Sequence, residues 1–165
     1  MSINQFKLNA NKTHILTVGT AERLATLDSE VEVTMDGLKL VEAEEKSELL
    51  LGCQLEKNLK WHRQIAELVK RLKKRLVGLQ VLKYILPYDT RKSLTTGIFN
   101  SVLVYCLPLF GGCDIGEIKQ LQVIQNKAAQ VVTHSPPRAN RDTMFDKLQW
   151  LSVNQLISSQ AISTV

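Results

Sequence analysis

Lysine and arginine side chains recur at helical spacing after residue 60, and they are the residues of this chain best suited to bind a ligand. Lys70, Lys73 and Lys74 are spaced to share one face of a helix, with Arg63 and Arg71 nearby. Each cationic group that neutralises a phosphate releases a counterion, so such a row suits contact with a nucleic-acid backbone. A charged helix face that meets only solvent has the same pattern, and the sequence leaves both interpretations open.

The candidate nucleic-acid contacts form one set of basic residues. They are Lys60, Arg63, Lys70, Arg71, Lys73, Lys74 and Arg75. Trp61 and His62 stand beside them, where they could stack on a base or a ribose. Alternatively, Trp61 is the first apolar anchor of the helix, because large aromatic side chains dominate core burial.

The sequence offers no arrangement for catalysis or for holding a metal ion. It has no Asp-Asp pair, no glycine-rich phosphate loop and no Ser, His and acid set around a recognisable elbow. His14 and His134 have no partner at ligand spacing, and the three cysteines include no Cys-x-x-Cys pair. We predict no catalytic residue, no metal ligand and no cofactor in this chain, and free cysteines in a reducing compartment.

The first third of the chain has the pattern of β-structure. Residues 30–35 and 38–41 alternate polar and apolar side chains around Asp36-Gly37, which predicts a hairpin with a primed turn. Residues 12–18 form a short apolar-leaning run. Residues 48–55 are predicted to form a further strand, with a glycine inside it where another backbone or a ligand approaches closely.

From residue 60 the apolar period becomes that of helices. An amphipathic helix is predicted up to about residue 85, before Pro87, from the spacing of Trp61, Ile65, Leu68, Leu72, Leu76 and Leu79. A second helix is predicted over residues 91–107, with Asp89 or Thr90 as N-cap. Its expected apolar face holds Leu94, Ile98, Val102 and Tyr105. Residues 115–132 are predicted to form a third helix, and residues 144–148 and 151–162 two shorter ones.

Composition and charge bound the class of protein. The chain has 165 residues, 44% of them hydrophobic, which suits one modest core with an attached subdomain. Its 21 Lys and Arg against 16 Asp and Glu give a net charge of +5, which moderately favours a polyanionic partner. No run of about 18 apolar residues and no signal peptide is present, so we expect no membrane partner and an intracellular location, nuclear or cytoplasmic.

These patterns predict an α+β fold in two parts. Residues 1–57 are expected to form a small antiparallel β portion, made of the hairpin and the further strand. Residues 58–165 are expected to form a helical bundle. The basic set would lie at the start of that bundle.

Several segments, taken in order, resemble the end of a reverse transcriptase from a non-LTR retrotransposon, a LINE-type, jockey-like element. LNANKT at residues 8–13 resembles the palm motif that follows the catalytic aspartate pair, and Leu51-Gly52 resembles the leucine and glycine of the primer-grip strand. NLKWHRQI at residues 58–65 resembles the start of the thumb helix. LQVIQNKAA at residues 121–129 and LQWLSV at residues 148–153 are similar to the family's "LQxxQNxAA" and "LxWLPV" segments.

The resemblance covers residues 8–157 approximately and implies roles for some of them. The bundle would be thumb-like and hold the template and primer duplex by its backbone. Lys12 and Thr13 would belong to a motif whose lysine assists pyrophosphate departure, and Leu51 and Gly52 would position the primer end. The aspartates that bind two Mg²⁺ ions would lie before Met1, so we expect no polymerase activity from this chain alone, and any magnesium would belong to the missing palm.

The expected function is therefore that of a truncated reverse transcriptase, an RNA-directed DNA polymerase remnant that binds RNA or an RNA-DNA hybrid. The alternative is a structural or protein-interaction module, or a non-functional translated fragment, in which the basic helix and the apolar LPLFGG stretch at residues 107–112 face a protein partner. An active polymerase would require that the chain be part of a longer product or receive a palm in trans. Binding to phosphates predicts steep weakening as salt rises, whereas an apolar partner surface predicts little change.

Overall fold

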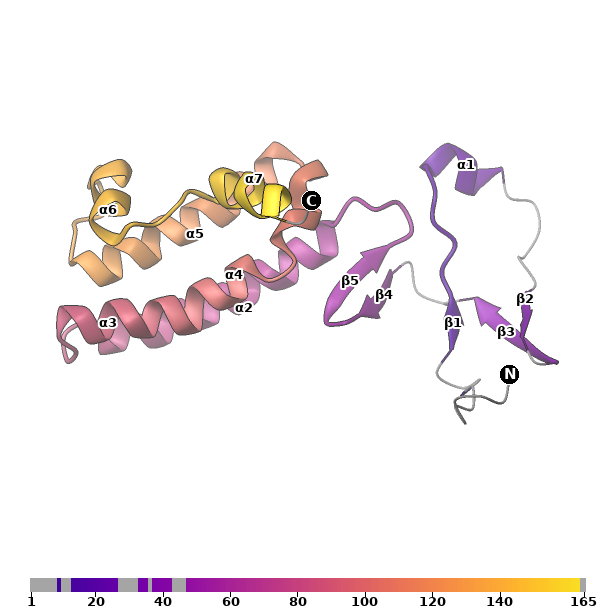
Figure 1. Cartoon of the computed structure of the whole chain (residues 1–165), viewed down its shortest axis with the longest axis horizontal. Helices are drawn as coiled ribbons and strands as arrows, with labels where there is room; N and C mark the ends of the chain where they lie inside the picture. Colours follow the sequence, from indigo (N-terminus) through magenta and orange to yellow (C-terminus); the bar gives the residue numbers. More distant parts are fainter. Residues whose placement is uncertain (1–8, 10–12, 27–32, 36, 43–46, 164–165) are drawn as a thin grey trace. The chain divides into compact units, whose positions relative to one another are not determined.

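The computed structural model describes residues 9, 13–26, 33–35, 37–42 and 47–163 (Figure 1). They combine helices with two small sheets, so the predicted α+β class is confirmed. The chain divides into two compact units, Met1–Trp61 and His62–Val165. The division lies four residues after the predicted boundary at residue 57.

The sheet of the first unit is built around the predicted hairpin. Strands β2 (Val33–Met35) and β3 (Leu38–Glu42) pair antiparallel with Met35 opposite Leu38, which leaves a two-residue turn. Gly37 in that turn has a φ of 78°, a conformation that glycine adopts without steric cost. The hairpin prediction is confirmed, and Asp36 lies outside the described residues.

The run at residues 12–18 contributes much less strand than its length suggests. Only β1 (His14–Ile15) is extended and paired, and it joins β3 in parallel, with His14 opposite Val41. The sequence did not predict this parallel pairing, because a parallel neighbour leaves no turn signal between the two strands. Helix α1 (Ala21–Ala25) follows, and the Thr20 hydroxyl caps it by accepting from the Arg23 backbone N–H.

The prediction of one strand over residues 48–55 is wrong. The segment is a second hairpin, with β4 (Ser47–Leu50) antiparallel to β5 (Cys53–Glu56). Leu51 and Gly52 form its turn with φ values of 49° and 79°, and two consecutive positive values are the geometry of a type I′ turn. The sequence signal was missed because a leucine at the first turn position is unusual, whereas Asn or Asp there is common.

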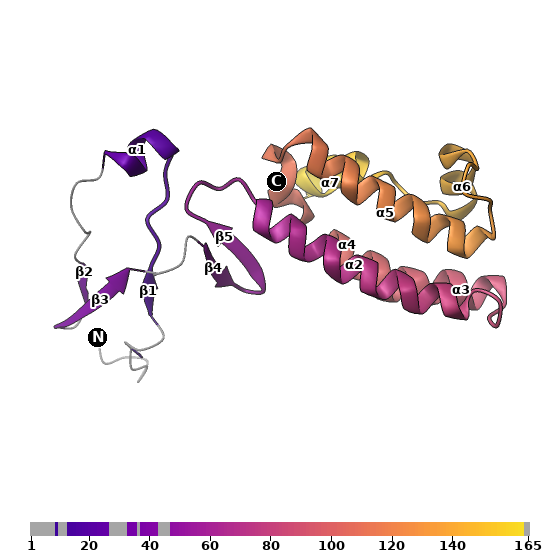
Figure 2. The same ribbon diagram turned by 180° about the vertical axis from the view of Figure 1, so that it is seen from behind.

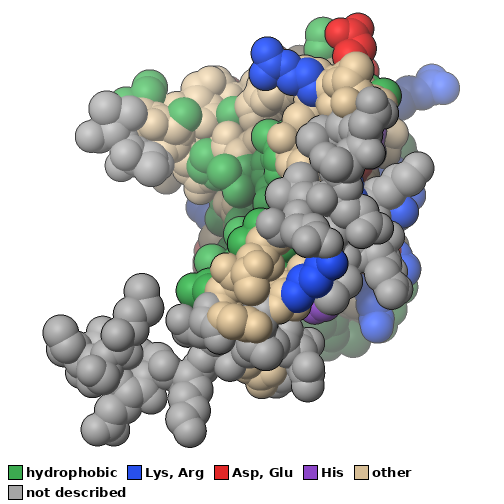
Figure 3. All heavy atoms as spheres, turned by 90° about the vertical axis from the view of Figure 1, so that its right-hand side faces the viewer, with side chains coloured by type: hydrophobic (Ala, Val, Ile, Leu, Met, Phe, Trp, Pro, Cys, Tyr) green, Lys and Arg blue, Asp and Glu red, His purple; other side chains and the backbone are tan. Residues whose placement is uncertain are grey.

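Among the described residues of the first unit, buried hydrophobic side chains are few. Leu40 in β3 and Cys53 in β5 are buried. Val33, Met35 and the Leu49–Leu51 run are exposed, and hydrophobic side chains are visible at the surface in the space-filling view (Figure 3). Apolar burial is therefore a small part of what holds these strands together.

The second unit begins with the long amphipathic helix α2 (His62–Leu82). Its buried face consists of Gln64, Ile65, Leu68, Val69, Leu72, Leu76 and Leu79, at the three- and four-residue steps of a helical stripe. The predicted helix is confirmed, although it ends at Leu82, before the chain reaches Pro87. Trp61 is half-buried and lies outside the helix with a φ of 63°, so the prediction that it anchors the stripe is wrong.

The next helical rod starts earlier than predicted and turns a different face inward. It consists of α3 (Tyr88–Thr95), a π-helical turn η2 (Thr96–Asn100) and α4 (Ser101–Val104), and Pro87 occupies the N-cap position. The N-cap prediction of Asp89 or Thr90 is wrong, because both lie in the first helical turn, where the Asp89 carboxylate suits the positive end of the helix dipole.

The inward face of this rod is the row next to the predicted one. Arg91, Thr95, Phe99 and Leu103 are buried, whereas Ile98 and Tyr105 are exposed. The sequence pattern predicted the wrong buried face because Leu94 and Val102 are half-buried at the edge of the face that the structure buries. The π-helical turn also shifts the register of a uniform 3.6-residue period.

The remaining elements complete the bundle. A 3-10 segment η3 (Leu107–Gly112) buries Leu107 and Phe110, and α5 (Ile115–Thr133) follows with Asp114 as its N-cap. Both ribbon views show α5 beside α2 (Figures 1 and 2), and the rod of α3, η2 and α4 also contacts α2. The α5 prediction at residues 115–132 is confirmed.

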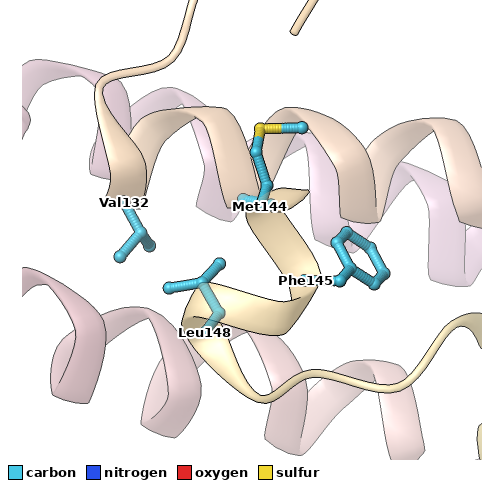
Figure 4. Packing of buried hydrophobic residues seen from close by; sticks show 5 residues of the cluster. Val132, Met144, Phe145 and Leu148 are labelled. Atoms are coloured by element: carbon cyan, nitrogen blue, oxygen red, sulfur yellow. The ribbon is translucent and has the colours of Figure 1, made fainter. Parts of the chain in front are cut away.

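Two short helices close the bundle along α5. Helix α6 (Arg141–Leu148) packs on the C-terminal end of α5, where Leu148 points toward Val132 beside Met144 and Phe145 (Figure 4). Helix α7 (Val153–Ser163) contacts α5 and η3. The predicted shorter helices at residues 144–148 and 151–162 are thus present, the first of them starting three residues earlier.

Candidate nucleic-acid interface

All the predicted basic contacts except Lys60 lie on α2, but they lie in three directions around its axis. Successive residues are about 100° apart around a helix. Arg63, Lys70 and Lys74 therefore lie opposite the buried stripe, and all three are exposed. The Lys70 ammonium is 3.5 Å from the Glu67 carboxylate one turn earlier, an exposed pair that solvent screens. We call these three residues the outer face.

Arg71 and Arg75 lie at one edge of the buried stripe and not on the outer face. The Arg75 guanidinium is half-buried and donates to the carbonyl of Ile98 in η2. Arg71 is exposed and lines a cavity of about 230 Å³ beside α4, together with Ser101 and Tyr105. The structure therefore does not bring these two arginines together with Lys70 and Lys74.

Lys60 belongs to the first unit, just before α2, where it is exposed and its backbone N–H donates to the Asn58 side chain at 3.1 Å. At the first residue of α2, His62 Nδ1 lies 2.5 Å from Glu117 Oε1 at the start of α5. This contact joins the two N-terminal ends of α2 and α5. The paired His62 ring is thus part of the helix-helix packing, which leaves the stacking role foreseen for it without structural support.

Lys73 lies at the opposite edge of the stripe from Arg75, and there it meets α5. A groove of about 380 Å³ between the two helices is lined by Lys73, by Lys119 and Lys127 of α5, and by the exposed Val123. Sequence reasoning missed Lys119 and Lys127. Lys119 and Lys127 each lie four residues from Val123, which places all three on one face of α5. This spacing could have predicted a basic face on that helix.

The groove is followed along α5 by a second hollow of about 450 Å³. Lys127 lines both, and the second is also lined by Lys83, Tyr84 and Gln130. The lining residues of the two include no Asp or Glu among those that the structure describes. We call the two hollows together the α2-α5 furrow.

Tyr84 is the aromatic side chain of the furrow. The residue is 82% exposed, and its ring meets the His134 ring edge-on at a centroid distance of 5.7 Å. The Lys83 ammonium lies 5.5 Å from the ring centroid. His134 is itself held at the end of α5, where its Nε2 lies 2.8 Å from the Lys83 carbonyl.

Arg91 fixes the ends of the two helices that form the furrow. It is buried, and its guanidinium donates to the carbonyls of Lys83 and Leu86 after α2 and of Val132 in α5, at 2.9, 2.8 and 2.9 Å. These carbonyls belong to helix C-terminal regions, whose partial negative charge favours a cation. Arg91 therefore ties the residues just after α2, which include Lys83, to the C-terminal end of α5.

The glutamines of the LQVIQNKAA segment hold the chain before α7. The Gln125 side chain is buried and donates to the Leu151 carbonyl at 2.9 Å, and Gln122 Oε1 accepts from the Val153 backbone N–H at 2.9 Å. Gln122 also donates to the side chains of Gln125 and Asn126. The two sequence segments at residues 121–129 and 148–153 are thus hydrogen-bonded to one another.

The other predicted motif residues lie in the first unit. Lys12 is outside the described residues, and the Thr13 hydroxyl donates to the Asn9 carbonyl at 2.9 Å. Leu51 and Gly52 are the exposed turn described above. Within the described part of the chain, no three His, Cys, Asp or Glu side chains come close enough to hold a metal ion, and no helix is long and apolar enough to cross a membrane.

Comparison of the chain with protein-family models, with curated proteins and with solved structures gave no match.

Proposed function

We propose that the helical unit binds the sugar-phosphate backbone of RNA or of an RNA-DNA hybrid through the outer face of α2. The observation that carries this proposal is the placement of Arg63, Lys70 and Lys74. All three are exposed on the side of α2 opposite its buried stripe. Cationic side chains held on a rigid helix suit phosphate contacts, which fix a protein on a duplex without reading its sequence.

The dimensions of the outer face fit this partner. Arg63 and Lys74 are eleven positions apart in the sequence, a rise of about 16 Å along the helix axis. Phosphates of one strand follow each other at about 3.4 Å along a duplex axis, so this length spans roughly five of them. Three cations over five phosphates support a moderate, salt-sensitive affinity.

The test is binding of a labelled RNA-DNA hybrid across a salt series. The variant R63Q/K70Q/K74Q removes the three charges, and R63K/K70R/K74R keeps them as the matched control. If each contact contributes about 0.9 to the slope of log affinity against log salt, the Gln variant loses about 2.7 of that slope. Equal slopes for the parent and the Gln variant would contradict the proposal.

A protein partner is the second candidate, and a different part of α2 favours it. Val77 and Val81 continue the outer side of α2 beyond Lys74, and Ile85 follows three residues after the end of the helix. They are 61%, 67% and 71% exposed. An exposed apolar stripe of this kind is typical of a surface that packs on another helix. Binding to such a surface would change little with salt, and V77S/V81S would abolish it while R63Q/K70Q/K74Q would not.

The relationship to non-LTR reverse transcriptases belongs to the same proposal. It is supported by the order and spacing of the segments quoted above, and it would make the helical unit a thumb-like holder of template and primer. On that view the paired carboxylates for Mg²⁺ would be supplied by a palm outside the described residues. A nuclear or cytoplasmic location is proposed with it.

A further inference from the structure

We infer that the α2-α5 furrow is a second polynucleotide site, which binds a single strand by phosphate contacts from its lysines and by stacking of a base on Tyr84. The inference goes beyond the proposed duplex contact, because it uses a different side of α2 and residues of α5. It rests on three observations: the charge of the furrow, its length and the exposure of one aromatic ring.

The charge of the furrow comes from both of its walls. Lys73 and Lys83 come from α2 and the residues just after it, and Lys119 and Lys127 come from α5. Because the described lining includes four lysines and no carboxylate, the lining of the furrow carries a net positive charge. A backbone lying in it would meet cations from two sides, whereas the outer face presents them from one.

The length of the first hollow of the furrow alone suits a short stretch of one strand. Lys119 and Lys127 are eight residues apart on α5, about 12 Å along its axis. At about 3.4 Å for each phosphate of a stacked strand, this holds roughly four nucleotides. Four nucleotides is at the small end of the site sizes known for single-strand binding folds.

Tyr84 supplies the feature that separates a polynucleotide from other polyanions. Tyr84 as a residue is 82% exposed at the edge of the furrow, and its ring contacts His134 and Lys83. An exposed aromatic ring beside a basic groove can stack on any base, since every base has a π-face. The base pairs of a duplex are already stacked within the helix, so the site favours single strands.

The experiment compares three ligands on the full chain: a labelled oligouridine of 12 nucleotides, an RNA-DNA hybrid, and inorganic polyphosphate of matched charge. The furrow variant is K83Q/K119Q/K127Q, with K83R/K119R/K127R as its charge-retaining control, and Lys73 stays unchanged in both. The ring is tested by Y84A against Y84F. The thermal unfolding of every variant is followed by circular dichroism, so that loss of fold is separated from loss of binding.

The expected result is that the parent binds oligouridine and that K83Q/K119Q/K127Q loses about 2 of its salt slope, at about 0.7 for each contact to a single strand. Y84A weakens oligouridine roughly 5- to 150-fold, leaves polyphosphate unchanged, and Y84F retains binding. R63Q/K70Q/K74Q keeps oligouridine binding.

Several outcomes would overturn the inference. These are no oligouridine binding by the parent, equal binding by the folded furrow variant, and equal loss in the folded outer-face variant. If Y84A weakens neither oligouridine nor polyphosphate, the furrow binds polyanions in general and the assignment to polynucleotides is wrong. If oligouridine binds in the furrow, the outer-face variant keeps that binding and the hybrid is not bound, the proposed contact between a duplex and the outer face fails and this inference stands.

Discussion

The two units of the chain differ most in how they are held together. Among the described residues, twenty buried hydrophobic side chains belong to the second unit, against Leu40 and Cys53 in the first. The second unit has its own core between α2, α5 and the rod of α3, η2 and α4, whereas the described strands of the first are two to five residues long. Apolar burial is the main favourable term in folding, so we expect the helical unit to fold independently of the β unit.

The largest effect that tests this comparison comes from one leucine in each unit. Leu72 is fully buried in α2, and L72A should lower the free energy of unfolding by about 3 to 5 kcal/mol through lost burial and the cavity that remains. L40A makes the same chemical change in β3 but should shift the helical transition by less than about 0.5 kcal/mol. The measurement is urea unfolding followed by circular dichroism at the helical wavelength.

The difference between the two units is contradicted if L40A lowers the free energy of unfolding of the helices as much as L72A does. That result would mean that the two units unfold as one cooperative body. The basic residues of α2 would then depend on the β unit for their placement.

Arg91 tests how much a buried charged side chain adds to the stability of the helical unit. Its buried guanidinium satisfies three carbonyls at the ends of α2 and α5, and R91A would leave them without that donor. Hydrogen bonds to a charged group contribute about 1.5 to 3 kcal/mol each at most and are not additive, so a loss of about 3 kcal/mol is expected. The control is R138A, an exposed arginine whose removal should cost less than about 0.5 kcal/mol.

The furrow adds a second readout for Arg91. Because Arg91 fixes the ends of the helices that carry Lys83 and Lys127, R91A should also weaken oligouridine binding at temperatures where the variant is still folded. A stable R91A variant with unchanged binding would show that other contacts set the width of the furrow.

The long helices were the most predictable part of the fold. In α2 and α5 a wide apolar stripe repeats over about five turns, so an error at one position leaves the pattern visible. The Asp36-Gly37 hairpin was also predictable, because its turn chemistry is local. The position of Trp61 was not predictable in this way. Its large side chain indicated a core anchor of the helix, although its backbone lies outside the helix.

The candidate site was only partly visible in the sequence. The prediction that Lys70, Lys73 and Lys74 share one face of the helix is right for Lys70 and Lys74 and wrong for Lys73, which lies on the side of α2 that meets α5. Arg75 could not be excluded from the set, because its burial depends on where η2 lies. The furrow requires α5 beside α2, and such packing between helices distant in the sequence leaves no signal in either one. The burial of Arg91 could not be predicted from the sequence, because burial of a charge depends on carbonyls that the fold brings to it.

Gln125 tests whether the resemblance segments owe their residues to packing. Its side chain is buried and bridges α5 to the Leu151 carbonyl, so Q125A removes this hydrogen bond together with the packing of the side chain and should cost about 2 kcal/mol. Q120A, an exposed change in the same helix, should be close to neutral. If Q125A is as stable as Q120A, the hydrogen bond to the Leu151 carbonyl is not what selects glutamine at this position.

Substitution of two glycines, one in each unit, is expected to change stability the least, and each change should be confined to its own unit. Gly52 turns β4 into β5 with a φ of 79°, where a side chain strains the backbone, so G52A should destabilise the hairpin by about 1 kcal/mol. Gly78 lies inside α2 with open space around the position of a Cβ atom. G78A should therefore stabilise the helical unit by about 0.5 to 1 kcal/mol. Hydrogen exchange measured separately for β4, β5 and α2 follows both changes. Since we expect the units to fold independently, each change should alter protection only in its own unit.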